Sequence, residues 1–145
     1  MIVFYLILAA VTAVSVGVFW RLMVGTLVML VGGFAGEAGM LPALLGFIIG
    51  MAGWIYIIYE IFAGEAAKLS ENSNNAGGQF AFNTLRLIVT VGWAIYPIGY
   101  FLGYLSGGEA TNFDTVNIVY NIADLVNKTA FGLAIWVGAT MDSSK

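Results

Sequence analysis

The chain has 145 residues, of which 61% are hydrophobic and only 9% are charged. Soluble domains carry about 25% charged residues, so this composition excludes an ordinary soluble protein and indicates an all-α integral membrane protein. The 8 acidic and 5 basic residues leave no basic surface for nucleic acid, and the absence of Cys and His excludes disulfides and ordinary zinc sites.

Five apolar segments are predicted to form helices, at about 1–15, 19–36, 41–63, 79–105 and 114–141, within a single domain over residues 1–145. The first is too short to span a bilayer, which needs roughly 20 mostly apolar residues. It is interpreted as the end of a helix that begins upstream. A signal peptide is the weaker alternative, because the positively charged n-region is missing. The polar stretch 64–78 is predicted to be an exposed loop, and 106–113 a turn.

The distribution of basic residues predicts the orientation in the membrane. Four of the five fall at one end of the alternating helices: Arg21, Lys68, Arg86 and Lys145. The connections at the other end carry only Glu37 and Glu109. Because cytoplasmic loops are rich in Lys and Arg, the C-terminus is predicted to be cytoplasmic.

Glycines spaced by four residues predict close contacts between helices, at Gly32 and Gly36, Gly46 and Gly50, and Gly99 and Gly103. Such pairs do not distinguish packing within one chain from packing between copies. A homo-oligomer therefore stays open as an alternative.

The last apolar segment carries one lysine near its centre. Asn117, Asn121, Asp124 and Lys128 recur at helical spacing and are predicted to form one polar stripe, which is apolar beyond Lys128. A charge at bilayer depth is costly and marks a functional site. The stripe predicts a polar route from outside to Lys128 and a dry route onward to the cytoplasm, as a one-way proton path requires. A buried structural ion pair between Asp124 and Lys128 is the alternative.

Aromatic residues accompany this lysine. They follow helical spacing in the third and fourth segments: Phe47, Trp54, Trp93, Tyr96, Tyr100 and Tyr104. An aromatic stripe alone usually belongs to a core. Beside a lysine inside the membrane, it indicates a pocket for a large apolar carbonyl compound, because a desolvated lysine forms Schiff bases.

Several motifs resemble those of microbial (type 1) rhodopsins. The run DLVNKTAFGLAIW, which contains Asp124 and Lys128, resembles the last helix of that family, and WAIYPIGY at 93–100 resembles its sixth helix. Three further runs resemble the proteorhodopsins in particular: FYLILAA at 4–10, GEAG at 36–39 and WIYIIYEIFAGE at 54–65.

This resemblance implies a seven-helix retinal protein of the bacterial inner (plasma) membrane, not an enzyme, that works as a light-driven outward proton pump. It implies that the chain is a C-terminal fragment, which supplies the end of the third helix and helices four to seven. The missing N-terminal helices and the lipid bilayer would be its partners. Retinal would be bound as a Schiff base on Lys128, with Asp124 as a counterion. The pocket would be lined by Met29, Gly33, Phe47, Gly50, Met51, Trp54, Trp93, Tyr96, Pro97 and Tyr100.

One position departs from the pattern of the pumping members. Val3 stands where these members carry a carboxylate proton donor, and the proton acceptor would lie upstream of Met1. This departure favours a sensory rhodopsin photoreceptor as one alternative. A retinal-free membrane protein with a structural Asp–Lys pair stays open as another. As a fragment, the chain alone is expected neither to pump nor to hold a stable chromophore.

Overall fold

The structure is a computed structural model that describes residues 1–105 and 113–143. Its elements follow in the order α1 (Ile2–Val11), α2 (Val16–Glu37), α3 (Ala43–Phe62), α4 (Glu65–Asn72), α5 (Ala76–Leu87), the π-helix η1 (Ile88–Gly92), α6 (Ile95–Tyr100), the π-helix η2 (Phe101–Leu105) and α7 (Phe113–Ser143). The predicted turn at 106–113, apart from its last residue, and residues 144–145 lie outside the described part.

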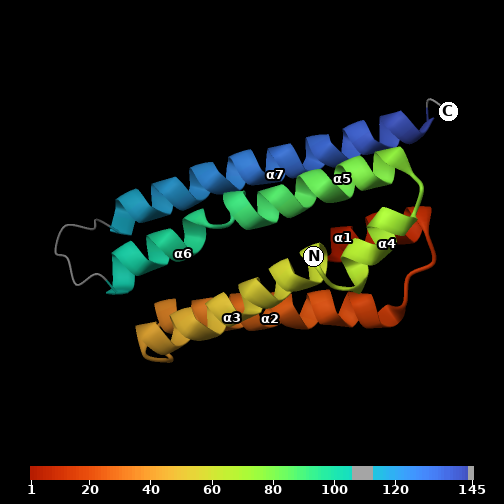
Figure 1. The fold of residues 1–145 in the computed structure, drawn as a ribbon. Helices are drawn as coiled ribbons and strands as arrows, with labels where there is room; N and C mark the ends of the chain where they lie inside the picture. The colour runs from red at the N-terminus through yellow and green to blue at the C-terminus, as the bar shows by residue number, and fades with distance from the viewer. Residues whose placement is uncertain (106–112, 144–145) are drawn as a thin grey trace.

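The helices form two layers (Figure 1). In one layer, α5, η1, α6 and η2 follow one another beside α7, and in the other α2 packs against α3. α1 contacts both α2 and α5, and lies with α4 toward the end that holds the C-terminus. We call this the α4 end and the opposite end the η2 end. Within the described residues, four stretches are long and apolar enough to cross a bilayer: Val16–Glu37, Ala43–Asn72, Ala76–Leu105 and Val116–Ser143.

The contact between α2 and α3 depends on glycine. A Cβ built on Gly46 would lie 2.6 Å from the Cα of Gly36, and one built on Gly53 would lie 2.5 Å from the backbone nitrogen of Met29. Both distances are too short for any residue with a side chain. Gly36 and Gly46, from two of the predicted glycine pairs, therefore make their close contact within this chain.

Replacing Gly46 by Ala is expected to destabilise the fold, because the added methyl meets backbone atoms that cannot move aside. Overpacking of this kind costs roughly 1–3 kcal/mol. The midpoint of thermal unfolding in detergent, followed by circular dichroism, should fall. Gly132→Ala is the matched control, since nothing lies within 4 Å of its added methyl. Equal midpoints for the two variants would contradict this account of the contact.

The prediction of an exposed loop over 64–78 is wrong for much of its length. Glu65–Asn72 form α4, a helix that packs Ala66 and Ala67 into the interior. Its first turn is stabilised by Glu60, whose Oε1 accepts a hydrogen bond from the backbone N–H of Ala66 at 3.2 Å. A carboxylate of α3 thus satisfies one of the free N–H groups at the start of this helix.

Two other helix limits differ from those predicted. α5 begins at Ala76, before the predicted start, because Asn75 caps it: the Asn75 side chain accepts a hydrogen bond from the N–H of Gly78 at 2.7 Å. α1 ends at Val11, before the predicted limit of the first segment, because Thr12 has the extended backbone angles φ −157° and ψ 166°. Local capping and backbone geometry thus set both limits.

An ion network ties α4 to α2 and α3. The guanidinium of Arg21 pairs with Glu65 and lies 3.4 Å from Oε2 of Glu60, whose residue is only 3% exposed. The Ser15 hydroxyl donates a hydrogen bond to Glu65 at 3.0 Å. One arginine thus holds two carboxylates, which fixes the break between α3 and α4.

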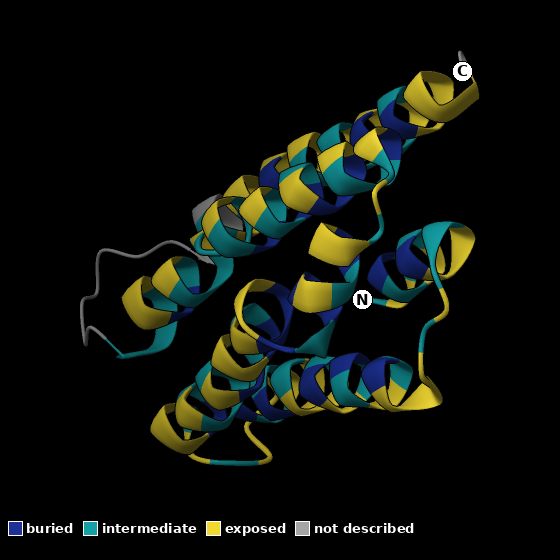
Figure 2. Cartoon of the chain, turned by 45° about the vertical axis from the view of Figure 1, so that its right-hand side comes forward, coloured by how far each residue is buried: buried dark blue, intermediate teal, exposed yellow. Residues whose placement is uncertain are grey.

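The apolar core lies between the layers at the α4 end. Phe4 packs edge-on against Phe82, with ring centroids 5.2 Å apart, and against Phe131 at 6.4 Å. The residues that are almost completely buried here form what we call the apolar plug: Phe4, Leu8, Val18, Leu22, Ile57, Ile61, Phe82, Leu85 and Val89. Exposed residues run along the outer sides of the helices (Figure 2), and many of these are large apolar side chains suited to lipid.

Candidate functional site

A cavity of about 700 Å³ lies between the two layers, on the η2 side of the apolar plug. Its walls come mainly from α2, α3, α6 and α7, with Trp93 from the turn between η1 and α6. Every residue that the sequence predicted for the pocket lines it: Met29, Gly33, Phe47, Gly50, Met51, Trp54, Trp93, Tyr96, Pro97, Tyr100, Asp124 and Lys128. Residues far apart in the sequence thus share one wall.

Aromatic side chains hold their places in this wall through contacts of their own. The Nε1 of Trp54 donates a hydrogen bond to the carbonyl of Val89 at 2.9 Å. The rings of Phe47 and Tyr100 lie 5.6 Å apart, and the Tyr100 hydroxyl donates to the carbonyl of Ala43 at 2.8 Å. These bonds go to backbone groups, so the aromatic wall is formed before any ligand binds.

The helix that carries Trp93 and Tyr96 changes its winding beside the cavity. In η1, the N–H of Trp93 bonds to the carbonyl of Ile88 at 3.1 Å, which is the π-helical spacing. The carbonyl of Gly92 accepts a hydrogen bond from Nδ2 of Asn127 at 3.0 Å. A π-helical turn shifts the register of the residues that follow, and here both aromatic side chains reach the cavity.

A chain of polar contacts runs along one side of the cavity. The Nζ of Lys128 pairs with Oδ2 of Asp124, and the Tyr96 hydroxyl donates a hydrogen bond to Oδ1 of the same carboxylate. Tyr120 in turn donates to the carbonyl of Tyr96 at 2.9 Å. Each carboxylate oxygen therefore has a partner, and two tyrosines of different helices fix the geometry around it.

Lys128 lies at an open edge of the cavity. Its side chain is 76% exposed, against 43% for Asp124, so the described residues do not desolvate the amine as the sequence predicted. The reason is that α7 turns another side, with Ala123 and Ala134, toward the interior. In a bilayer this edge meets lipid or another protein segment, and an amine left against lipid at this depth is costly.

The predicted polar stripe on α7 is only partly right. Asn117 and Asn121 are exposed and do not line the cavity. Sequence reasoning instead missed three polar residues that do: Glu37, Tyr120 and Asn127. The spacing of positions 120, 124, 127 and 131 marks the correct face of α7.

The comparisons with known proteins agree with one another. A sequence profile described as bacteriorhodopsin-like protein matches residues 1–141. The chain is 52% identical over 141 residues to the blue-light absorbing proteorhodopsin of Gamma-proteobacterium Hot 75m4, a match that covers 97% of this chain and 56% of the relative. It is 30% identical over 114 residues to sensory rhodopsin III of Haloarcula marismortui, covering 77% of this chain and 47% of that relative.

Two solved structures show the same fold. The crystal structure of a blue light-absorbing proteorhodopsin from Med12 matches with a TM-score of 0.77 and 55% identity, covering 96% of this chain and 59% of that chain. The crystal structure of Exiguobacterium sibiricum rhodopsin gives a TM-score of 0.81 at 35% identity, over 98% of this chain and 66% of that one. The chain thus spans little more than half the length of the curated proteorhodopsins that it matches.

Proposed function

Because this chain belongs to the bacteriorhodopsin-like family of microbial rhodopsins, we propose that it binds retinal covalently on Lys128 and forms part of a light-driven outward proton pump of the proteorhodopsin type. Members of this family are transporters or receptors rather than enzymes. The observation that carries the proposal is the cavity itself, in which an amine, a paired carboxylate and an aromatic wall meet.

The residues present fit retinal, a long apolar molecule with one aldehyde. Small-molecule sites usually measure about 300–1,000 Å³ and are mostly apolar, and this cavity measures about 700 Å³ with largely apolar walls. Among the described residues that line it, Lys128 carries the one side-chain amine. An aldehyde at the open edge could therefore reach Lys128 while its apolar chain lies against the rings of Trp54 and Trp93.

Retinal, when bound, would supply the absorption of visible light. The chain's own residues would do the rest. Lys128 would hold the group, and Asp124 would balance the positive charge on the lysine nitrogen. Tyr96 keeps one oxygen of that carboxylate in place by its hydrogen bond. The indole of Trp54, fixed to the backbone of η1, would confine the group from the α3 side.

The direction of transport is supported by charge and packing. Arg21, Lys68 and Arg86 lie toward the α4 end, whereas Glu37 lies at the η2 end, a distribution that favours a cytoplasmic α4 end in a bacterial plasma membrane. The apolar plug separates the cavity from the α4 end. A proton released near Lys128 would therefore leave toward the η2 end, which is outside in this orientation.

One observation favours a photosensor as the second candidate. Val3 lines the cavity on the side of the plug, where the resemblance to pumping members calls for a carboxylate proton donor. Valine cannot pass on a proton, so resupply from the cytoplasm would be slow. A slow photocycle suits a sensory rhodopsin better than a pump.

We also propose that the chromophore needs further helices beyond those of this chain. The cavity is open beside Lys128, and the chain covers 56% of the length of a proteorhodopsin to which it is 52% identical. A segment equivalent to the unmatched part of that relative would cover the amine and complete the wall.

The test is to add all-trans-retinal to membranes that contain this chain, alone or co-expressed with the preceding helices of a proteorhodopsin. We expect a visible absorption band, and acidification of the medium on illumination, only with both segments present. A band from the chain alone would contradict the need for further helices. A band without acidification would favour the photosensor. No band in either case would contradict retinal binding and favour a structural Asp–Lys pair.

A further inference from the structure

A second cavity, of about 240 Å³ and polar, lies between α4 and α5, away from the candidate site. It is lined by Ala67, Ser70, Glu71, Gln79, Asn83 and Arg86. We propose that it binds the headgroup of a phospholipid of the adjacent leaflet, with the phosphate on Arg86 and a primary amino group on Glu71. This inference does not depend on retinal.

Three hydrogen-bond donors point the same way along α5. Gln79, Asn83 and Arg86 stand at i, i+4 and i+7, so they share one side of the helix and face the same cavity. Gln79 uses one N–H of its amide to bond the carbonyl of Glu71 at 3.1 Å, which fixes α4 against α5. The second N–H of Gln79, the Asn83 amide and the Arg86 guanidinium form a donor set suited to phosphate oxygens.

Arg86 is held in place without an anionic partner. Its guanidinium lies 4.8 Å from the centroid of the Phe62 ring. The ion pairs found among the described residues use Arg21 and Lys128 but not Arg86. A guanidinium is the cation that binds phosphate through two parallel hydrogen bonds, and this one is free to do so.

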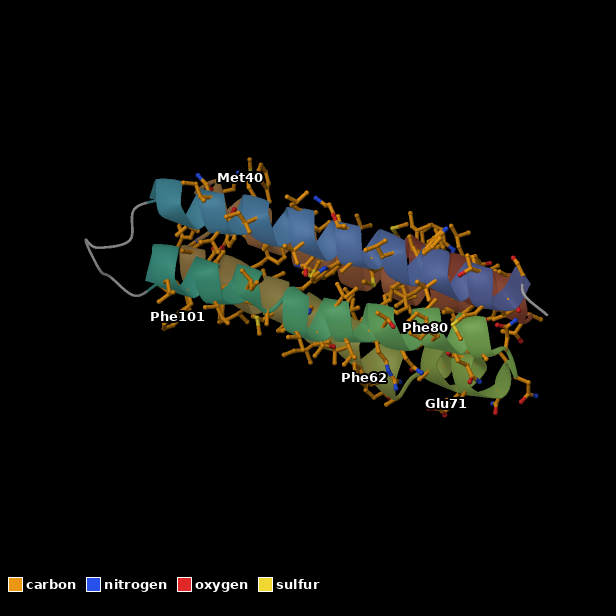
Figure 3. The ribbon with its side chains drawn as sticks, turned by 90° about the horizontal axis from the view of Figure 1, so that it is seen from above. Met40, Phe62, Glu71, Phe80 and Phe101 are labelled. Carbon is orange, nitrogen blue, oxygen red and sulfur yellow. The ribbon has the colours of Figure 1, made fainter. Side chains whose placement is uncertain are left out.

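The depth of the cavity matches that of lipid headgroups. The 19 residues from Leu87 to Leu105 are close to the roughly 20 that a helix needs to cross a bilayer. Arg86 therefore stands at the edge of the hydrocarbon region. Phe62 and Phe80 are 41% and 39% exposed and lie toward the same end as Glu71 (Figure 3), as aromatic residues do at membrane interfaces.

The charges on the two walls select the kind of headgroup. Pockets that bind anionic lipids collect several basic residues, whereas this cavity pairs Arg86 with Glu71. Phosphatidylglycerol has the phosphate but no positive group to balance Glu71, whereas an ammonium group would be attracted to this carboxylate. A primary amine can donate hydrogen bonds to the Glu71 carboxylate, which a trimethylammonium group cannot. The arrangement therefore favours phosphatidylethanolamine over phosphatidylglycerol and phosphatidylcholine.

Native mass spectrometry of the purified chain tests this inference. In micelles that contain equal amounts of the three lipids, we expect one phosphatidylethanolamine to be retained in preference. Arg86→Gln and Glu71→Gln should each lower its retention by roughly tenfold, the effect of losing one charge-assisted hydrogen bond. Lys68→Gln is the matched control, because Lys68 is exposed on α4 and does not line the cavity.

Each other outcome overturns the inference. Preferred retention of phosphatidylglycerol, or equal loss in the Lys68 control, would exclude the zwitterionic site. Displacement of the lipid by soluble glycerophosphoethanolamine at equal concentration would mean a site for a soluble phosphate compound. Circular dichroism checks the folding of each variant. If Arg86→Gln loses helicity, Arg86→Lys is tested in its place. This variant keeps the positive charge and should retain more lipid than Glu71→Gln.

Discussion

Lys128→Ala is expected to abolish the visible absorption band of the pigment assembled from this chain, all-trans-retinal and the preceding helices of a proteorhodopsin. The physical reason is that Lys128 carries the one side-chain amine among the described residues of the cavity wall, and the side chain of alanine offers no nitrogen for a covalent bond. Absorption spectra of purified membranes measure the effect, which should be a complete loss rather than a shift.

The control for this prediction is Lys68→Ala, which removes an exposed lysine outside the cavity and should leave the band intact. Folding should survive in both variants, because the Lys128 side chain is 76% exposed within this chain and is not part of the apolar plug. A visible band that persists in Lys128→Ala would remove the covalent assignment and leave retinal, if bound, held by the apolar wall alone.

Asp124→Asn is expected to shift the absorption band and to slow light-driven proton movement. The substitution keeps the shape of the side chain but removes the negative charge paired with the lysine nitrogen. A positive chromophore would lose the charge that stabilises it near the nitrogen, so the band should move to longer wavelength. Proton movement should fall on the order of a hundredfold, as it does when a preorganised charge or donor is removed from other sites. Flash spectroscopy and pH recordings on illuminated vesicles measure the two effects.

Asp142→Asn serves as the matched control. Asp142 lies on the same helix but outside the cavity, where it accepts a hydrogen bond from Asn75 at 2.7 Å. Its substitution should leave the colour unchanged. If Asp124→Asn behaved like this control, the Asp124 carboxylate would be remote from the chromophore, and another acid would have to balance its charge.

The walls of the cavity were predictable because aromatic residues kept helical spacing beside a lysine, and because the motifs resemble those of a known family. Asn127 escaped prediction for a physical reason. Its hydrogen bond to Gly92 depends on the π-helical turn of η1, and a Cβ on Gly92 would lie only 2.2 Å from the Asn127 Oδ1. No periodicity in the sequence indicates a π-helical turn, so neither Asn127 nor Gly92 was predicted to belong to the site.

α4 is the opposite case: its sequence contains local signals for a helix, but the signals for a loop around it were given more weight in the prediction. Glu65 begins a run of good helix formers, and its negative charge favours the first turn of a helix. The Gly, Ser and Asn residues around this run suggested a loop instead. The contact that ties α4 to the rest of the fold is the ion pair of Glu65 with Arg21, a residue of α2 that lies 44 positions earlier, and no single segment contains that information.

Burial of Lys128 could not be read from the sequence either. Hydropathy places the residue at the middle of a spanning helix, but the cover around its amine depends on which side of α7 packs against the neighbouring helices. Ala123 and Ala134 occupy the buried side, which leaves Lys128 at the edge. Depth in the membrane and enclosure by protein are therefore separate properties, and only the first follows from a hydrophobic pattern.

The apolar plug also has an electrical consequence. A membrane keeps its voltage only if resting proteins do not let ions leak through it. The phenylalanine, leucine, isoleucine and valine side chains of the plug are closely packed and leave no space for water or ions. In the dark this half of the bundle would thus act as insulation, and a cell could keep many copies without draining its stored energy.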